Sequence, residues 1–100
     1  MAYRIRYLPK AIRQIDAIFA YIADRNPAAA RRVVATIRRN IQRLADFPYS
    51  ARSSEVEDVC ELVIAHYPYV VFYAVDDEAR EVHILRVRHA ARDPAHHLTE

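Results

Sequence analysis

The order of hydrophobic patterns along this 100-residue chain predicts an α+β domain, in which a helical hairpin packs on one face of a largely antiparallel sheet. The first residues alternate between apolar and charged side chains with a period of two. Two apolar repeats with helical spacing follow, and three runs rich in β-branched and aromatic residues come after them. The expected element order is therefore β-α-α-β-β-β.

The first strand is expected over residues 2–8, where apolar side chains at odd positions alternate with Arg4 and Arg6. A strand with this pattern buries one face and leaves the other in solvent. Pro9 then suits the first turn of a helix, because the N–H that proline lacks would have no helical partner there.

Two helices are expected next. Isoleucines at helical spacing extend the first helix to about Arg25. Asn26 and Pro27 indicate the start of the second, since a capping side chain is followed by proline at the first helical position. This helix has an apolar stripe through residues 33–44, and most of its arginines lie off the stripe. Because the join is short, the two helices must run antiparallel.

The second half of the chain is expected to complete the sheet. A polar, irregular segment up to Asp58 is predicted to be the main loop. Apolar runs predict strands over Val59–Ala65, Tyr69–Val75 and Val82–His89. The domain is expected to occupy residues 1–94 and to be followed by a polar tail over residues 95–100. Since the chain has no glycine, its turns must use other residues, some in left-handed geometry at a cost.

Composition favours a cytoplasmic protein without a metal or cofactor. A single cysteine, Cys60, excludes an intrachain disulfide framework. No apolar run approaches the roughly 20 residues that a membrane-spanning helix needs, and the N-terminus lacks the apolar core of a secretory signal. The five histidines have no cysteine or carboxylate at ligand spacing, so no metal site is expected.

The charge is unevenly distributed. Residues 1–43 carry ten Lys/Arg and two acids, whereas residues 44–100 carry five Arg and eleven acids. A basic half suggests a polyanionic target or an acidic protein partner. Fourteen of the fifteen cationic residues are Arg, whose forked donors suit carboxylate and phosphate. Solvation of helix faces is an equally good explanation for any single arginine.

Candidate chemistry is concentrated at the end of the last expected strand, in Arg86, Arg88, His89 and Arg92. Alternation places Arg86 and Arg88 on one face, with His89 on the opposite face or at the strand end. Such a group can bind phosphate or move a proton during RNA cleavage. An equally good explanation of these charges is that they keep an exposed edge strand from pairing with another chain.

Five segments of the chain, in their order and spacing, resemble the RelE/ParE toxin superfamily from about residue 3 to residue 94. They are Tyr-Arg-Ile-Arg-Tyr-Leu-Pro-Lys-Ala at 3–11, Asn26-Pro27, Phe-Pro-Tyr-Ser-Ala-Arg at 47–52, Tyr-Pro-Tyr-Val-Val-Phe-Tyr at 67–73 and the segment 82–94. The resemblance implies the same β-α-α-β-β-β fold. Two departures are Ala51, where relatives usually carry Gly, and Cys60, where they often carry Arg.

The resemblance also bears on the target. RelE-like members cut messenger RNA on the ribosome without a metal, and ParE-like members inhibit DNA gyrase. The nuclease branch commonly carries a catalytic Arg at the start of the third strand and a Tyr after the C-terminal His. Here Val70 and Ala90 stand at or near those positions. The resemblance therefore favours a ParE-like gyrase inhibitor, in which no residue is catalytic.

Two alternatives remain open. One is a ribosome-dependent mRNA endoribonuclease that uses Arg86, Arg88 and His89, and the other is a non-toxic module that only holds an antitoxin. The residues expected to contact the target are Arg52, Arg86, Arg88, His89 and Arg92. No membrane contact and no sequence-specific DNA binding by this chain are expected.

Every alternative implies a cognate antitoxin as partner. Antitoxins of such systems typically have a partly disordered, acidic and apolar segment that folds onto the toxin. The residues expected to hold this segment lie on the helical hairpin, at Arg13, Phe19, Arg31 and Arg38.

Overall fold

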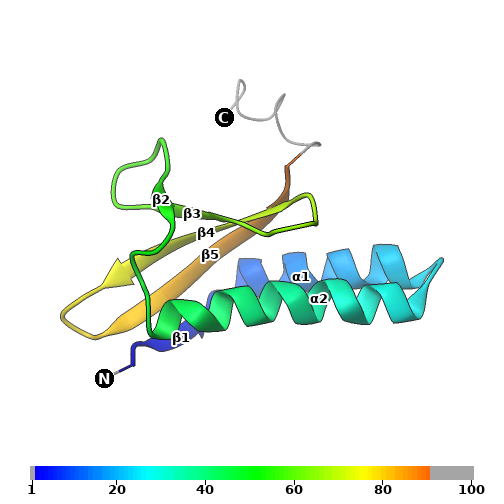
Figure 1. Cartoon of the computed structure of the whole chain (residues 1–100), viewed down its shortest axis with the longest axis horizontal. Helices are drawn as coiled ribbons and strands as arrows, with labels where there is room; N and C mark the ends of the chain where they lie inside the picture. The colour runs from blue at the N-terminus through cyan, green and yellow to red at the C-terminus, as the bar shows by residue number, and fades with distance from the viewer. Residues whose placement is uncertain (1, 91–100) are drawn as a thin grey trace.

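A computed structural model describes residues 2–90 of the chain, and within them two helices lie against one face of a five-stranded sheet (Figure 1). The elements in chain order are β1 (Arg4–Tyr7), α1 (Pro9–Ala23), α2 (Pro27–Gln42), the 3₁₀ helix η1 (Arg43–Ala45), β2 (Arg52–Ser53), β3 (Cys60–Val63), β4 (Tyr69–Asp76) and β5 (Glu81–His89). The polar tail expected over residues 95–100 lies outside the described residues.

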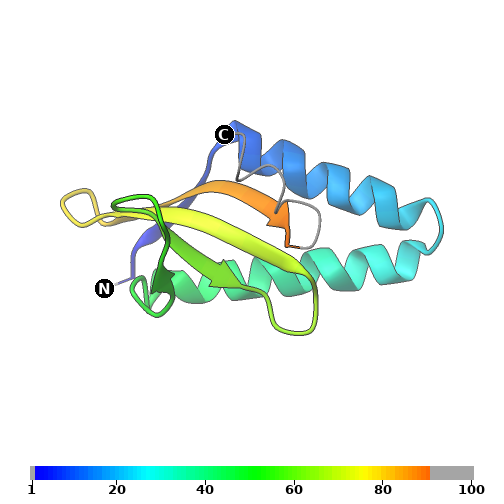
Figure 2. The same ribbon diagram turned by 90° about the horizontal axis from the view of Figure 1, so that it is seen from above.

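The sheet has the strand order β1-β5-β4-β3-β2. The β1 strand runs parallel to β5, and the other neighbours are antiparallel. The view from above shows α1 and α2 as an antiparallel hairpin beneath the sheet (Figure 2). The predicted α+β class, the helical hairpin and the largely antiparallel sheet are therefore confirmed.

One strand was not predicted. The segment expected to be an irregular loop contains β2, whose Arg52 and Ser53 pair with Glu61 and Cys60 of β3. Two residues are too few to produce a recognisable alternation, so this strand leaves no signal in the sequence.

Both helices begin where the sequence predicts. Proline occupies the first turn of α1 and of α2. The Asn26 side chain accepts a hydrogen bond from the Ala29 backbone N–H at 3.0 Å, which satisfies one donor that the helix itself cannot. The α1 helix ends at Ala23, two residues before the expected end.

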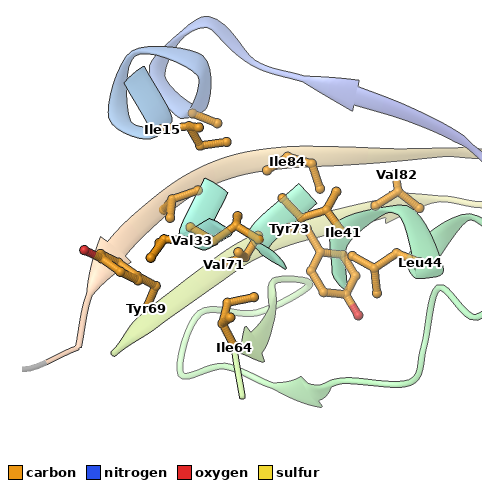
Figure 3. Close-up of a cluster of buried hydrophobic side chains, with 13 residues drawn as sticks. Ile15, Val33, Ile41, Leu44, Ile64, Tyr69, Val71, Tyr73, Val82 and Ile84 are labelled. Atoms are coloured by element: carbon orange, nitrogen blue, oxygen red, sulfur yellow. The ribbon is translucent and has the colours of Figure 1, made fainter. Parts of the chain in front are cut away.

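The core lies between the helices and the sheet, and Figure 3 shows its largest side chains together. Ile37 and Ile41 of α2 are fully buried, as are Val71 and Tyr73 of β4 and Ile84 of β5. Tyr69 is buried on the same face of β4 as Tyr73. These two tyrosines thus pack beneath the helices as part of the core.

The absence of glycine is visible in the turns. Asp58, His66 and Arg80 have φ values of 64°, 73° and 55°. Left-handed geometry costs an ordinary L-residue about 1–2 kcal/mol, and less for Asp. The chain therefore closes these three turns in the way that the composition predicts, with non-glycine residues in left-handed geometry.

Candidate functional site

A pocket of about 570 Å³ lies on the face of the sheet that the helices leave uncovered. Its floor is apolar and includes Val70 and Phe72 of β4 and Leu85 of β5. These side chains point away from the core because the neighbouring Val71 and Ile84 point into it. The segment from Ser54 to Val59 forms one wall.

An extra residue in β5 shapes this pocket. Phe72 pairs with Arg86 and Tyr73 pairs with Ile84, so Leu85 is inserted between two pairs. This bulge turns two consecutive side chains, Leu85 and Arg86, toward the pocket.

Arg86 and Arg88 both line the pocket, as alternation predicts. Their guanidinium carbons lie 5.8 and 5.7 Å from the centre of the Phe72 ring. Cations at this distance are attracted to the face of an aromatic ring. Arg88 is only 9% exposed, so its charge is held in a largely desolvated position. The pocket thus combines an apolar floor with two ordered guanidinium groups.

Arg52 lies at the rim of the pocket. Its Nε donates to Glu61 Oε1 at 3.0 Å, and Glu61 itself lines the pocket. The Arg52 side chain is largely exposed, so this ion pair is accessible from solvent. The register places Arg52 on the same face of the sheet as Arg86, with Glu61 and Phe72 between them on β3 and β4.

His89 lies apart from these arginines. Its ring packs edge-on against Tyr69 with a centroid distance of 5.3 Å, and Tyr69 is buried on the core face of β4. His89 is therefore on the opposite face of β5 from Arg86 and Arg88. Arg92, the fifth residue expected to contact the target, lies outside the described residues.

Two positions at which the nuclease branch is expected to differ both line the pocket. Val70 supplies part of the floor, and Ala90 lies at its edge. Ala51 and Cys60, in contrast, are half-buried and pack against the core. Ala51 and Cys60 thus affect the packing of the core. Val70 and Ala90 instead determine which chemical groups line the pocket.

The residues expected to hold an antitoxin lie on the outer surface of the hairpin. Arg13 and Arg31 are exposed, and Phe19 of α1 is 36% exposed. The Arg38 guanidinium lies 5.4 Å from the centre of the Tyr7 ring. Burial raises the pKa of the Tyr7 phenol, and Arg38 opposes this shift.

A second exposed apolar side chain lies on the same face of α1 as Phe19. Ile12 lies seven residues earlier on the same face of α1 and is 43% exposed. The two form an apolar stripe on α1, so the hairpin surface offers apolar groups as well as cations.

One polar cluster was not anticipated from the sequence. The hydroxyls of Tyr3 and Tyr49 donate to the two carboxylate oxygens of Asp77 at 2.7 and 2.6 Å. The bonds from Tyr49 and then from Tyr3 lower the pKa of Asp77. The bond to Asp77 raises the pKa of Tyr49 to about 12 and also raises that of Tyr3. The cluster joins segments that are up to 74 residues apart in the chain.

No metal site forms within residues 2–90, where no three His, Cys, Asp or Glu side chains are grouped to hold an ion. His83 faces away from the core, where it contacts Glu81 at 2.9 Å, and His89 lies on the core face. The bulge at Leu85 lies between the two histidines and places them on different faces of β5. The described helices also include none long and apolar enough to cross a membrane.

Comparison with known proteins shows which family this chain resembles. The sequence model of the ParE toxin of the type II toxin-antitoxin system parDE matches residues 5–94. The chain is 42% identical over 87 residues to the candidate toxin Y4kP of Sinorhizobium fredii, covering 87% of this chain and 88% of that protein. It is 37% identical over 83 residues to toxin RelE2 of Caulobacter vibrioides, covering 83% and 90%.

Solved structures share the fold. A chain of the chromosomal ParDE system of P. aeruginosa superimposes with a TM-score of 0.77 at 25% identity, covering 88% of this chain and 96% of that one. The isolated E. coli RelE toxin superimposes with a TM-score of 0.66 at 14% identity, covering 98% and 95%. The chain therefore belongs to the family of ParE toxins of type II toxin-antitoxin systems, within the RelE/ParE superfamily.

Proposed function

We propose that this toxin acts in the cytoplasm by binding DNA gyrase, without cleaving RNA, and that a cognate antitoxin neutralises it. The observation that carries the choice of target is the lining of the pocket. Val70 and Ala90 stand at or near the positions where the nuclease branch is expected to carry Arg and Tyr, and both line the pocket that holds Arg86 and Arg88. Cutting a phosphodiester bond requires groups that move protons at the bond, and aliphatic side chains cannot do this.

The position of His89 supports the same choice. A general acid must reach the leaving oxygen from the side on which the phosphate binds. His89 packs against Tyr69 on the core face, whereas the two arginines face the pocket. The phosphate-binding and proton-moving groups of a nuclease would thus be separated by the strand.

The pocket suits a protein target. Arg and aromatic side chains contribute most of the energy at many protein interfaces, especially at desolvated positions. Arg86 and Arg88 are ordered over Phe72, and Arg52 extends the cationic surface at the rim. We propose that these three residues contact the target from the uncovered face of the sheet, and that His89 and Arg92 also contribute to target binding.

The ribonuclease remains the second candidate, because two guanidinium groups in a concave pocket can also bind phosphate. One experiment separates the two activities. The purified chain is added to a gyrase supercoiling reaction and, separately, to a translation reaction whose mRNA is mapped by primer extension. We expect inhibition of supercoiling at micromolar concentration and an intact mRNA. Cuts within translated codons that disappear in His89→Ala would establish the nuclease, and supercoiling would then be unaffected.

A chain that inhibits neither reaction would be a non-toxic module that retains only antitoxin binding. Normal growth of cells that express the chain without its antitoxin would show the same. Either result would contradict the gyrase proposal.

Antitoxin binding is proposed for the helical hairpin. The similar chains from P. aeruginosa and M. tuberculosis belong to the ParDE system and the RelBE2 toxin-antitoxin complex. We propose that an acidic, apolar antitoxin segment contacts Arg13, Phe19, Arg31 and Arg38. The exposed apolar stripe on α1 and the cations beside it match both properties of such a segment.

A further inference from the structure

A second pocket, of about 510 Å³, lies on the opposite side of α2 from Arg38. It is formed by the last turns of α2, by η1 and by the turn between β3 and β4. Figure 2 shows this turn projecting from the sheet beside α2. The pocket is separate from the one on the uncovered face of the sheet, because the two share no lining residue.

Most of the residues that line the second pocket carry hydrogen-bond donors on their side chains. Arg39, Asn40 and Arg43 contribute a guanidinium, an amide and a second guanidinium, and His66 adds an imidazole. Ala65 is its only apolar lining residue. Guanidinium and amide donors that lie together suit a compact anion.

Two of the donors are held in position by hydrogen bonds to Thr36. Arg39 Nη2 donates to Thr36 Oγ1 at 3.2 Å, and Asn40 Nδ2 donates to the Thr36 carbonyl oxygen at 2.8 Å. Arg39 and Arg43 are four residues apart, so they lie on the same side of the helix, about 5–6 Å apart at Cβ. Two guanidinium groups at this separation can bind one phosphate from both sides.

The charge extends beyond the pocket. Residues 27–42 include four arginines and no acid. Arg32 is exposed and lies on the same stripe of α2, about 10 Å before Arg39 at 1.5 Å per residue. Successive phosphates of one DNA strand advance about 3.4 Å along the axis, so this distance corresponds to about three steps. The stripe therefore matches a phosphate chain and not only a single ion.

Two features of the pocket oppose anion binding. Asp46 contributes one carboxylate, and the C-terminus of α2 carries a partial negative charge. Arg39 and Arg43 together outweigh both. Without these two arginines the local charge would be negative, and the loss of binding should be large.

We infer that Arg32, Arg39 and Arg43, with Asn40 and His66, form a docking site for the phosphate backbone of a nucleic acid. The site is independent of base sequence. Its assignment to DNA held by gyrase rests on the proposed function, whereas the phosphate site itself does not. In a gyrase complex this contact would hold the toxin on the DNA while the pocket on the sheet contacts the protein.

The test measures binding of the full chain to a fluorescein-labelled 20-base-pair duplex by anisotropy, between 50 and 200 mM NaCl. The dependence of log K on log salt gives the number of phosphate contacts. In Arg39→Gln/Arg43→Gln we expect the slope to become about 2 units shallower and the affinity at 50 mM salt to fall by about 10-fold or more. A duplex of scrambled sequence should give the same values.

Two control variants make the result specific. Lys10→Gln/Arg25→Gln removes the same charge from exposed positions elsewhere and should leave the slope within about 0.5 unit of wild type. Arg39→Lys/Arg43→Lys keeps the charge and should retain most of the affinity. A melting temperature equal to wild type by circular dichroism confirms that each variant is folded.

Three outcomes would overturn the inference. In the first, the slope of Arg39→Gln/Arg43→Gln equals that of wild type. In the second, Lys10→Gln/Arg25→Gln weakens binding equally, so that the attraction is diffuse. In the third, polyglutamate displaces the duplex more effectively than unlabelled DNA of equal charge, so that the surface binds an acidic protein. The binding assay contains no gyrase, so a negative result would not contradict the proposal that the toxin binds gyrase. The supercoiling assay tests that proposal separately.

Discussion

Asp77 shows how a single residue can connect distant parts of this chain. Its carboxylate accepts hydrogen bonds from Tyr3, before β1, and from Tyr49, after η1. The Arg80 guanidinium lies 4.7 Å from the centre of the Tyr3 ring and adds a positive charge nearby. The turn between β4 and β5 is thereby tied to both segments that flank the helical hairpin.

This cluster predicts a specific dependence of stability on pH. The hydrogen bonds lower the pKa of Asp77 in the folded state. A lowered pKa stabilises the fold above the unfolded value, near 3.9, and this contribution is lost as the pH falls through the folded value. We therefore expect the stability difference between wild type and Asp77→Asn to shrink below about pH 4. Urea denaturation between pH 7 and pH 2.5 measures it, and a difference that is constant with pH would contradict the cluster.

Some of these residue-scale features were predictable and others were not. Alternation placed Arg86 and Arg88 on one face and His89 on the other correctly, because the bulge at Leu85 precedes all three. The same bulge separates His83 from His89, which alternation alone could not reveal. The Asp77 cluster depends on contacts across most of the chain, and no local pattern reports such contacts.

At the scale of elements, one side chain compensates for a strand that ends early. The β1 strand pairs with β5 only as far as Ile84, and the chain then turns into α1. Beyond that point the Gln14 side chain of α1 accepts a hydrogen bond from the Val87 backbone N–H at 2.6 Å. The contact fixes α1 against the half of β5 that carries the arginines.

Replacing this glutamine should loosen that half of β5. In Gln14→Leu the half-buried Val87 N–H loses its acceptor, at a cost of about 1–3 kcal/mol. We expect the Val87 amide to exchange with solvent at least about 5-fold faster in hydrogen-exchange NMR. Gln14→Glu retains an oxygen acceptor and should keep the protection. Equal protection of Val87 in the Leu variant would show that the bond does not hold the strand.

The long strands, α1 and the start of α2 were predicted to within about two residues because each leaves a periodic pattern or a capping signal. The β2 strand was missed because its two residues form no pattern, and it pairs with β3 across an irregular segment. The pocket walls were missed for the same reason. The sequence identified the arginines of the site but not the segment from Ser54 to Val59 that forms one wall of the pocket.

At the scale of the whole molecule, the uneven charge of the sequence corresponds to separate surfaces. The basic first half forms the helical hairpin, with the proposed antitoxin surface on one side and the proposed phosphate site on the other. The sheet supplies the pocket on its uncovered face, where Arg86 and Arg88 lie over Phe72. One small domain can thus present three different surfaces at once.

The central claim is that the pocket on the sheet binds gyrase and does no chemistry. The most direct measurement is inhibition of gyrase supercoiling by the wild type, Arg86→Ala and Lys10→Ala. Circular dichroism first checks that each protein is folded. Removing Arg86 should raise the concentration for half-inhibition by about 10-fold or more, as expected for a principal interface residue, whereas Lys10→Ala should match wild type. Equal inhibition by all three proteins would contradict the claim.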